Sequence, residues 1–463
     1  MSEATGLGEA IEKLRRDGAA DATVAAFEHY ARRLADGDLG VLAESEIAPV
    51  TELPDADDLG APGPQAAQLL DQTVVIKLNG GLGTSMGMTR AKSLLEIKDG
   101  LSFLDVIARQ LLDLRAAYAG RLPLVLMNSF HTREESLAAL SRYPGLAADL
   151  PPDVVQSRVP KLLDDGSLRP AVAAASAELE WAPPGHGDLY TALGSSGILT
   201  TMLERGYRYA FVSNADNLGA VLEPAILRWF ADQQAPFLME VADRTAADRK
   251  GGHLARRAGG GLVLREVAQT APDDLAAFQD VERHRYFNTN TIWLDLRALA
   301  AVMGRTGFIE LPMIVNRKTL DPSDPSSPSV IQLETAMGAA IDAFDGALAL
   351  RVPRTRFLPV KTTDDLLVLR SDAYRLDERS RVVLAPERAG RAPLAELDPR
   401  FFKLIGDFDA RFPAGPPSLV ACERLTVRGD VRFGAGVVVH GVAAVEHTGE
   451  GQLVIADGSV LGA

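Results

Sequence analysis

Cysteine is almost missing from this chain of 463 residues, which holds Cys422 alone. One thiol cannot close an internal disulfide, and it cannot supply the set of thiolates that a zinc site of that kind needs. The sequence therefore excludes a disulfide-stapled scaffold and a thiolate zinc centre.

Two kinds of apolar segment are also lacking. The first residues, MSEATGLGEAIEKLRRDG, do not contain a charged-then-apolar targeting signal. No run of about 18 apolar residues is present that could cross a bilayer. We therefore expect a cytoplasmic protein with no membrane partner.

Basic side chains are too few for a typical nucleic-acid binder. The chain has 48 Lys and Arg against 62 Asp and Glu, a formal net charge of −14. Because a nucleic-acid protein needs a basic face, we expect no nucleic-acid partner. Lysine is scarcer still, with nine of the 48 basic residues. A lysine ammonium and an arginine fork differ chemically, so each lysine carries some information, although genome composition explains any single one.

The length predicts two or three domains with at least one sizeable core. Residues 1–70 are expected to form an N-terminal helical segment that caps the main domain, ending in a polar, Pro-containing linker at 51–64. Helical spacing of Val24, Phe27, Ala31 and Leu34 places these side chains on one face. We expect a catalytic domain over 71–378 and a separate module over 379–463.

Short apolar runs separated by helix-like stretches fill the middle of the chain. Runs of strand length lie at 74–78, 124–127, 209–213, 237–241, 291–296 and 347–352, and helix-like stretches include 102–120 and 189–206. Strands that alternate with helices indicate an α/β fold with a mainly parallel central sheet covered on both faces. In such sheets ligands bind beyond the carboxyl ends of the strands.

The last portion has a different pattern. Leu425, Val431 and Val437 recur six residues apart, with glycines between them. This spacing predicts a small parallel β-helix of hexapeptide type, and an ordinary antiparallel meander is the alternative.

A glycine-rich loop directly follows the first buried strand. Its sequence, KLNGGLGTSMG at 77–87, has neither the Walker closure nor the GxGxxG spacing. Glycines allow a tight turn and let backbone amides approach an anionic or planar ligand, so the loop predicts a nucleotide or phosphate site, with a purely structural turn as the alternative. Arg90, Lys92 and Lys98 follow closely, and at least one of them should reach the ligand.

Nine strings in order resemble one family. The string LNGGLGTSMGMTRAKS (78–93) is similar to the nucleotide-binding signature of the eukaryotic-type UTP–glucose-1-phosphate uridylyltransferases, also called UDP-glucose pyrophosphorylases. The others are MNSFHTREES (127–136), QSRVPKL (156–162), WAPPGHGDLY (181–190), FVSNADNLGA (211–220), DRKGGHL (248–254), FNTNTIWLDL (287–296), VIQLETAMGAAI (330–341) and RFLPVKTTDDLL (356–367). The resemblance covers roughly residues 70 to 375.

This resemblance implies a Rossmann-like nucleotidyltransferase fold of GT-A-like type. It also implies a reversible, Mg²⁺-dependent transfer of a uridylyl group from UTP to glucose 1-phosphate by direct in-line displacement. The matched nucleotide-binding positions are Leu78, Asn79, Gly80, Gly81, Gly83, Thr84, Gln156, Gly185, His186 and Asn214. Backbone amides at the paired glycines and a side-chain amide suit the edge of a uracil, because both offer donors and acceptors.

Asp216 is the candidate Mg²⁺ ligand. It follows a buried strand, where a hard cation and phosphates would meet, and the family's matching aspartate binds magnesium. The alternative is an aspartate that caps the next helix.

The sugar-binding residues implied by the resemblance are Gly252, Glu266, Asn288 and Asn290. If 288–290 is a strand, the two asparagines point to the same side and line one pocket. The alternative is that each asparagine satisfies its own turn.

Lys92 and Lys361 are the catalytic candidates, expected to hold phosphate oxygens. A solvated surface lysine is the alternative for Lys361. The chain departs from the family's pattern at Arg90-Ala91, where Gly-Pro is usual, and at Met88, where cysteine is frequent. The first departure predicts an additional cation beside the phosphates.

Other functions remain open at this stage. A broad-specificity UDP-sugar pyrophosphorylase, or an enzyme for an N-acetylhexosamine phosphate, would share this chemistry, although Asn79 and Ser85 favour the glucose enzyme over the latter. A sugar-nucleotide-dependent glycosyltransferase would normally carry two aspartates where this chain has Asn214 and Asp216. A non-catalytic sugar-nucleotide binding protein is the third alternative. The C-terminal module could also pair edge to edge in a homo-oligomer.

Overall fold

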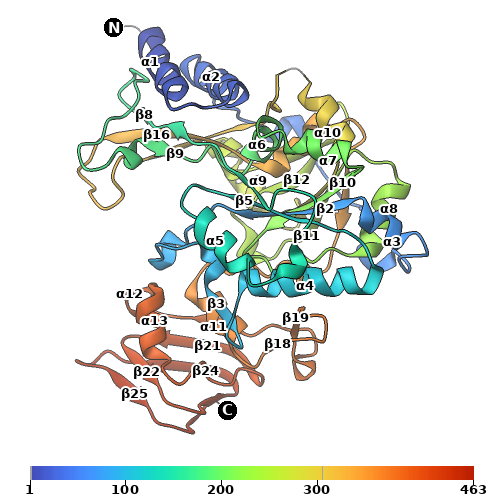
Figure 1. The fold of residues 1–463 in the computed structure, drawn as a ribbon. Helices are drawn as coiled ribbons and strands as arrows, with labels where there is room; N and C mark the ends of the chain where they lie inside the picture. The colour runs from blue at the N-terminus through green and yellow to red at the C-terminus, as the bar shows by residue number, and fades with distance from the viewer. Residues whose placement is uncertain (1–2, 305, 463) are drawn as a thin grey trace.

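A ten-stranded sheet forms the centre of the computed structural model, which describes residues 3–304 and 306–462 (Figure 1). Its main path runs β1-β12-β14-β10-β2-β5-β6, and β11, β13 and β17 attach beside it. The strands are β1 Ile47–Pro49, β2 Thr73–Asn79, β5 Leu124–Asn128, β6 Asp153–Val155, β10 Tyr209–Asn214, β11 Phe237–Asp243, β12 His253–Arg257, β13 Leu262–Arg265, β14 Tyr286–Asp295 and β17 Leu348–Arg351. The six apolar runs of the sequence all fall on these strands.

The sheet is mixed, so the expectation of a mainly parallel sheet is wrong. Strands β10, β2, β5 and β6 are parallel neighbours, whereas β14 is antiparallel to β10, β11 and β12. Strand direction depends on how the chain returns to the sheet, and apolar content shows only that a strand is buried. The α/β class itself is confirmed.

Helices cover both faces, and alternate residues of one strand enter different cores. Helices α4 (Phe103–Tyr118) and α8 (Pro224–Asp232) pack on the face that receives Val75, whereas α6 (Asp188–Ser195), α7 (Ile198–Glu204) and α10 (Leu296–Met303) pack on the face of Val74. Figure 1 shows α4 on one side of the sheet and the other group opposite. The predicted helix 189–206 is divided at Gly197, whose φ of 75° ends one helix and starts the next.

The N-terminal helices pack on a small side sheet. Helices α1 (Glu3–Arg16) and α2 (Asp21–Ala35) bury Val24, Phe27, Ala31 and Leu34 against residues that include Met313 and Leu333. That sheet contains β8 Leu162–Leu163, β15 Met313–Thr319 and β16 Ser329–Thr335. The predicted helical face is confirmed. The segment is more than a cap, because β1 also joins the central sheet by pairing with β12.

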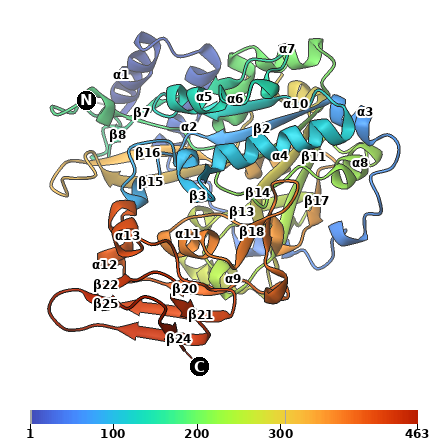
Figure 2. The same ribbon diagram turned by 60° about the horizontal axis from the view of Figure 1, so that its bottom comes forward.

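Parallel pairs of short strands make up most of the C-terminal part, at the bottom of Figure 1 and toward the viewer in Figure 2. The pairs are β20 (Leu394–Glu396) with β21 (Cys422–Arg428), β21 with β24 (Gly441–Glu446), β22 (Val431–Phe433) with β25 (Leu453–Ile455), and β23 (Val438–Val439) with β26 (Val460–Leu461). Leu425, Val431 and Val437 are buried. The antiparallel alternative is therefore wrong for these pairs.

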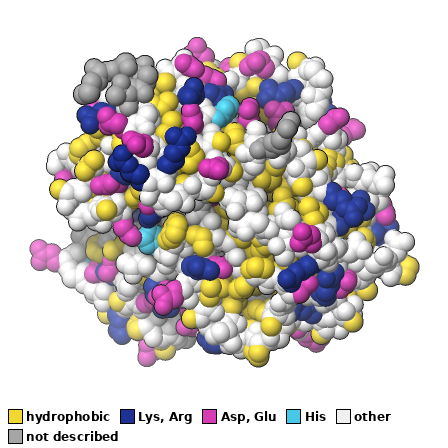
Figure 3. All heavy atoms as spheres, turned by 45° about the horizontal axis from the view of Figure 1, so that its top comes forward, with side chains coloured by type: hydrophobic (Ala, Val, Ile, Leu, Met, Phe, Trp, Pro, Cys, Tyr) yellow, Lys and Arg dark blue, Asp and Glu magenta, His cyan; other side chains and the backbone are white. Residues whose placement is uncertain are grey.

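The remaining elements connect these layers. They are α3 Ala66–Asp71, β3 Glu96–Lys98, β4 Leu101–Ser102, α5 Arg133–Leu140, β7 Val159–Pro160, β9 Trp181–Ala182, α9 Leu275–Gln279, α11 Thr363–Arg370, β18 Tyr374–Leu376, β19 Val382–Leu384, α12 Pro399–Phe402 and α13 Ile405–Arg411. Within residues 3–304 and 306–462, no helix has the length and apolar content that a bilayer crossing needs. On the face drawn in Figure 3, acidic and basic side chains lie interspersed.

Candidate active site

A cavity of about 310 Å³ opens where three parallel strands, β2, β5 and β10, end. Its lining consists of Leu78, Asn79, Gly80, Gly81, Lys92, Ser93, Met127, Gln156, Pro183, Gly185, His186, Asn214, Ala215 and Asp216. The carboxyl ends of parallel strands meet at one edge of a sheet, which is where α/β proteins place ligands. The sequence-predicted nucleotide residues therefore gather in one pocket, except Gly83 and Thr84.

The glycine loop folds back on itself and brings Lys92 to the cavity. Lys92 N donates to the Gly81 carbonyl at 3.0 Å. Gly83 has a φ of 67°, and a Cβ there would lie 3.0 Å from the Met88 sulfur and 3.3 Å from a side-chain carbon of Lys92. Gly83 and Thr84 thus lie outside the cavity lining, and Gly83 packs against the stem of Lys92.

Gln156 lies directly over Gly80. A Cβ on Gly80 would be 2.6 Å from Gln156 Oε1, and Gln156 Nε2 donates to the Gly185 carbonyl at 3.0 Å. Only glycine lets the backbone and this amide approach so closely. The pair presents backbone and amide groups with the donor and acceptor mixture that a planar base edge needs.

Asn79 lines the cavity, but its side chain is used for internal hydrogen bonds. Its Nδ2 donates to Asn128 Oδ1 at 2.7 Å and to Ser136 Oγ at 2.8 Å. Asn128 in turn donates to Asp153 at 3.1 Å. Asn79 therefore fixes the loop between β2 and β5, and its backbone is the part available to a ligand.

His186 is half-buried in the cavity wall, and its ring is neutral. Its Nδ1 accepts a hydrogen bond from Met337 N at 3.0 Å, and burial lowers the pKa of the ring to about 4. Because Nδ1 accepts, the ring proton lies on Nε2, which makes that nitrogen a donor. His186 can thus donate a hydrogen bond to a ligand without carrying a charge.

Gly185 gives the first testable prediction. Its φ is 80°, and a Cβ would lie 2.4 Å from the Thr335 carbonyl oxygen. We expect Gly185→Ala to destabilise the fold by about 2–4 kcal/mol, because backbone strain adds to a clash with main chain. Urea unfolding measures this loss. Gly166→Ala is the matched control, since its φ is 81° but no atom lies within 4 Å; equal losses in the two variants would contradict the role of the clash.

Asp216 and Lys92 form an ion pair at the cavity. Asp216 Oδ2 lies 2.6 Å from Lys92 Nζ, with side-chain exposures of 25% and 16%. The next helix, α8, starts at Pro224 with Glu223 as its N-cap, so the alternative of Asp216 as a helix cap is wrong. Among the described residues no group of three or more His, Cys, Asp or Glu could hold a metal ion. One carboxylate beside exposed loop backbone fits Mg²⁺, which usually takes most of its ligands from water and from phosphates of a bound substrate.

Lys361 lies outside the cavity lining, on a segment joined to the Asp216 loop. Val360 N donates to the Asp216 carbonyl at 3.3 Å, and Leu358 N donates to Asn217 Oδ1 at 2.8 Å. The side chain of Lys361 is exposed, with its ammonium 5.7 Å from the centre of the Phe357 ring. The segment is therefore fixed beside the metal candidate, whereas the lysine itself is free to swing on its four-carbon stem.

Two of the three cations after the loop point elsewhere. Arg90 is largely exposed and lies 3.3 Å from Glu135, so the expectation that it adds a cation beside the phosphates is wrong. Lys98 Nζ donates to the Arg370 carbonyl at 3.2 Å, beneath α11. Arg90 is thus paired with the Glu135 carboxylate and Lys98 with a backbone carbonyl, both outside the cavity lining. Of the three, Lys92 alone lines the cavity.

The predicted sugar residues lie together: Gly252 directly precedes β12, Glu266 directly follows β13, and the two asparagines lie within β14. A Cβ on Gly252 would be 2.5 Å from the Glu266 carboxylate, and Asn288 N donates to the Gly252 carbonyl at 3.2 Å. Burial raises the pKa of Glu266. None of these residues lines the nucleotide cavity itself.

Asn288 and Asn290 do face one another, but through a distortion of the strand. Asn290 has a φ of 56°, and β14 shifts register against β11 at this point. Asn288 Nδ2 donates to Asn290 Oδ1, and Asn290 N donates to Asn288 Oδ1, both at 2.9 Å. The reason given for their common side, regular strand alternation, is therefore wrong, and each asparagine partly satisfies the other.

Some lining residues are absent from the sequence prediction. They are Ser93, Met127, Pro183 and Ala215. Each lies inside one of the matched strings, and Ser93 and Ala215 are also direct neighbours of predicted residues, so membership in a matched string was the available signal. Met127, Pro183 and Ala215 have no reactive side-chain group, so a search for such groups passes over them. The Ser93 hydroxyl is polar, and it is buried without a hydrogen-bond partner among the described residues.

Comparison of the whole chain with known proteins gives the same family as the matched strings. A sequence model of the family described as "UTP–glucose-1-phosphate uridylyltransferase" matches residues 24–440. The chain belongs to this family. It is 38% identical over 422 residues to the UTP–glucose-1-phosphate uridylyltransferase of Solanum tuberosum, covering 91% of this chain and 84% of that protein. It is 37% identical over 466 residues to the protein of that name from Hordeum vulgare, covering 99% and 96%.

Solved structures of the family share the whole fold. A variant of the UDP-glucose pyrophosphorylase from Leishmania major, solved in complex with UDP-glucose, superimposes with a TM-score of 0.92 at 43% identity, covering 98% of each chain. A structure described as UDP-glucose phosphorylase from Trypanosoma brucei gives a TM-score of 0.91 at 44% identity, covering 99% of this chain and 98% of that one. The fold of these family members therefore extends over nearly the whole chain.

Proposed function

We propose that this protein transfers a uridylyl group from UTP to glucose 1-phosphate, giving UDP-glucose and pyrophosphate. The observation that carries the proposal is the cavity at the ends of β2, β5 and β10, where an uncharged, donor- and acceptor-rich wall meets the Lys92–Asp216 pair. The first part suits a uracil and the second suits phosphates. Family membership supports the same reaction.

The chain needs no general base for this reaction. A phosphate monoester oxygen of glucose 1-phosphate is already an anionic nucleophile, so it attacks the α-phosphorus directly and pyrophosphate leaves from the opposite side. Catalysis then consists of aligning the two substrates and neutralising charge on the transferring and leaving phosphates. Lys92 provides a cation at the cavity, and Lys361 provides a second one on an adjoining segment.

Asp216 would hold Mg²⁺ through its carboxylate once the ion pair with Lys92 opens. The ion, when bound, neutralises phosphate charge and stabilises the leaving group. Because Lys92 and Asp216 lie 2.6 Å apart, the lysine ammonium now occupies the space beside the carboxylate. Once released from Asp216, the Lys92 ammonium would be able to bind the β- and γ-phosphates.

Glucose 1-phosphate would bind over β12, β13 and β14. Glu266 offers a carboxylate, Gly252 a backbone group, and Asn288 and Asn290 two planar amides to the hexose hydroxyls. The absence of a side chain at Gly252 leaves room for the Glu266 carboxylate, because a Cβ there would lie 2.5 Å from its oxygens. Hydroxyl recognition needs such fixed polar groups on rigid elements.

Measuring pyrophosphate release from UTP against a panel of sugar 1-phosphates tests the function. We expect release with glucose 1-phosphate in the presence of Mg²⁺ and none with UTP alone. Comparable rates with galactose, xylose and glucuronic acid 1-phosphates would favour a broad-specificity UDP-sugar pyrophosphorylase. No release with any acceptor would contradict the proposal and favour a glycosyltransferase or a non-catalytic binding protein.

Lys361→Ala should lower turnover more than it weakens binding of the base. We expect kcat to fall by about 10²-fold, since a cation aimed at developing phosphate charge is worth that much in similar sites. Uridine affinity should stay unchanged, because uridine has no phosphate. Steady-state kinetics and calorimetric uridine titration give the two values, with exposed Lys403→Ala as the control. Near-normal UDP-glucose formation by Lys361→Ala would show that the role is misassigned.

The C-terminal strands support a second, structural proposal. Their parallel pairs join residues 18 apart, Leu425 with Ala443, and 22 apart, Val431 with Leu453, as expected for coils of a short parallel β-helix. Val442 and Val460 are exposed, at 63% each. Edge-to-edge pairing of this module would produce a homo-oligomer, and light scattering of the purified chain measures that directly.

A further inference from the structure

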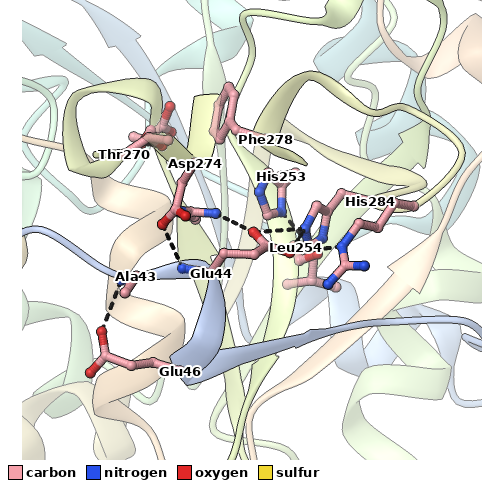
Figure 4. Close-up of polar contacts among 12 residues, drawn as sticks. Ala43, Glu44, Glu46, His253, Leu254, Thr270, Asp274, Phe278 and His284 are labelled. Atoms are coloured by element: carbon pink, nitrogen blue, oxygen red, sulfur yellow. Dashed lines mark hydrogen bonds and ion pairs between the residues drawn. The ribbon is translucent and has the colours of Figure 1, made fainter. Parts of the chain in front are cut away.

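Glu44 is the centre of a polar cluster that no part of the proposed reaction uses. The cluster, called here the Glu44 cluster, comprises Glu44, Arg265, Asp274, Arg283 and His284 (Figure 4). The Glu44 carboxylate lies 2.5 Å from Arg265 Nη1, 2.7 Å from Arg283 Nε and 3.0 Å from His284 Nε2. One carboxylate of the N-terminal segment thus joins two separate parts of the catalytic domain.

The charges of this cluster depend on one another. The Arg265 side chain has no exposed surface, and its second partner is Asp274 at 3.0 Å. Asp274 also accepts a hydrogen bond from Glu44 N at 2.7 Å. Burial acts to raise the pKa of Glu44, but hydrogen bonds from His284 and Arg283 outweigh it and lower the pKa, so the carboxylate stays ionised. A buried guanidinium that lost one of two carboxylates would be strongly destabilised.

The cluster adjoins the proposed sugar site. Arg265 immediately precedes Glu266, and His253 immediately follows Gly252. The Arg265 side chain contacts Glu44 and Asp274. The Glu266 carboxylate lies beside Gly252 instead. Arg265 and His253 are direct partners across β12 and β13. The His253 ring stacks on that of His284, with centres 3.8 Å apart, and thereby extends the cluster beneath Gly252.

The N-terminal segment also holds the backbone of Glu266. Leu42 N donates to the Gln269 carbonyl at 2.9 Å, and Gln269 Oε1 accepts from Glu266 N at 2.8 Å. Two independent connections, one through side-chain charge and one through backbone, therefore run from residues 42–44 to the residue that carries the sugar-facing carboxylate. The tight contact of Glu266 with Gly252 leaves little room for either to shift.

We propose that Glu44 is a positioning residue for the hexose phosphate. Through Arg265 and His284 it fixes the two strand ends that carry Glu266 and Asn288, and so it sets the affinity for the sugar substrate without touching it. The inference rests on the proposed function. The fourteen residues that line the nucleotide cavity include no member of the Glu44 cluster, so its effect falls on one substrate.

Glu44→Gln tests this role, with Glu46→Gln as the matched control. Glu46 lies in the same short turn, but its side chain is exposed and accepts a hydrogen bond from Ala43 N. We expect Glu44→Gln to raise the KM for glucose 1-phosphate by about tenfold, as loss of a supporting partner does at other sites, and to change the KM for UTP by less than about twofold. Its preference for glucose over galactose 1-phosphate, as the ratio of kcat/KM, should fall too.

The result has distinct outcomes. Equal changes in both KM values, or none in a folded Glu44→Gln variant, would overturn the inference while the proposed function stands. No turnover by the unsubstituted chain would overturn the proposed function instead. Arg283→Ala gives a second reading should Glu44→Gln fail to fold, because its side chain is 45% exposed. That variant should raise the KM for glucose 1-phosphate but not the KM for UTP. An unchanged KM for glucose 1-phosphate would contradict the positioning role of Glu44.

Discussion

Replacing Asp216 by alanine is expected to lower kcat for UDP-glucose formation by about 10³-fold, because a metal that neutralises phosphate charge contributes several kcal/mol to the barrier. Asp216 lies in the loop that follows β10 at the cavity, and its partner there is Lys92 at 2.6 Å. The affinity for uridine should remain normal, since Gly80 and Gln156, the residues proposed to bind the base, are unchanged in this variant. Kinetics at several Mg²⁺ concentrations measure the effect.

Saturating Mg²⁺ should not restore the alanine variant, whereas Asp216→Glu should recover part of the activity at high Mg²⁺. Asp232→Ala is the control, because that carboxylate is 52% exposed beside Arg228 on α8. If the activity of Asp216→Ala stays within about tenfold of the unsubstituted chain, a difference of about 1.4 kcal/mol in the barrier, then Asp216 does not hold the metal.

Lys92→Ala is expected to have the second largest effect, a loss of about 10²- to 10³-fold in kcat. The loop geometry explains why the expected loss of kcat is large. Lys92 N donates to Gly81 and the Lys92 side chain packs against Gly83, so no neighbouring cation can take its place. Arg90 and Lys98 are occupied by Glu135 and by backbone carbonyls. Steady-state kinetics and uridine titration separate turnover from base binding.

Lys92→Arg distinguishes charge from shape. A guanidinium is a planar fork, and in the space beside Gly83 it should restore little of the activity. Full activity of Lys92→Arg would mean that a positive charge near the phosphates is sufficient. Uridine affinity that falls together with kcat in Lys92→Ala would indicate a disturbed loop rather than a lost catalytic group.

The nucleotide half of the site was predictable from the sequence, and the sugar half only in part. Gly80 and Asp216 follow strands whose apolar runs are plain, so the chain order alone brings them to one sheet edge. Gln156 follows β6, which none of the predicted apolar runs includes, and Lys92 reaches the cavity because its loop folds back on Gly81. The position of Asn290 depends on a bulge, which arises from the pairing of β14 with β11 and has no local signal. The residues were therefore found, but the reason for their placement was not.

Long-range pairing limited the rest of the prediction. The apolar pattern identified six of the ten strands of the central sheet, yet the antiparallel direction of β14 depends on the path that returns the chain from β13. Glu44 was missed for the same reason. In the sequence it looks like any solvated glutamate, because its partners Arg265 and His284 lie more than 200 residues away. Residues that act through distant partners leave no pattern in the local sequence.

The most direct test of the central claim is ³¹P NMR of the purified chain with UTP, glucose 1-phosphate and Mg²⁺. The account predicts UDP-glucose and pyrophosphate in equal amounts, no reaction when glucose 1-phosphate is left out, and regeneration of UTP when pyrophosphate is added to UDP-glucose. Formation of UMP or inorganic phosphate in place of UDP-glucose, or pyrophosphate that appears without a sugar phosphate, would contradict it.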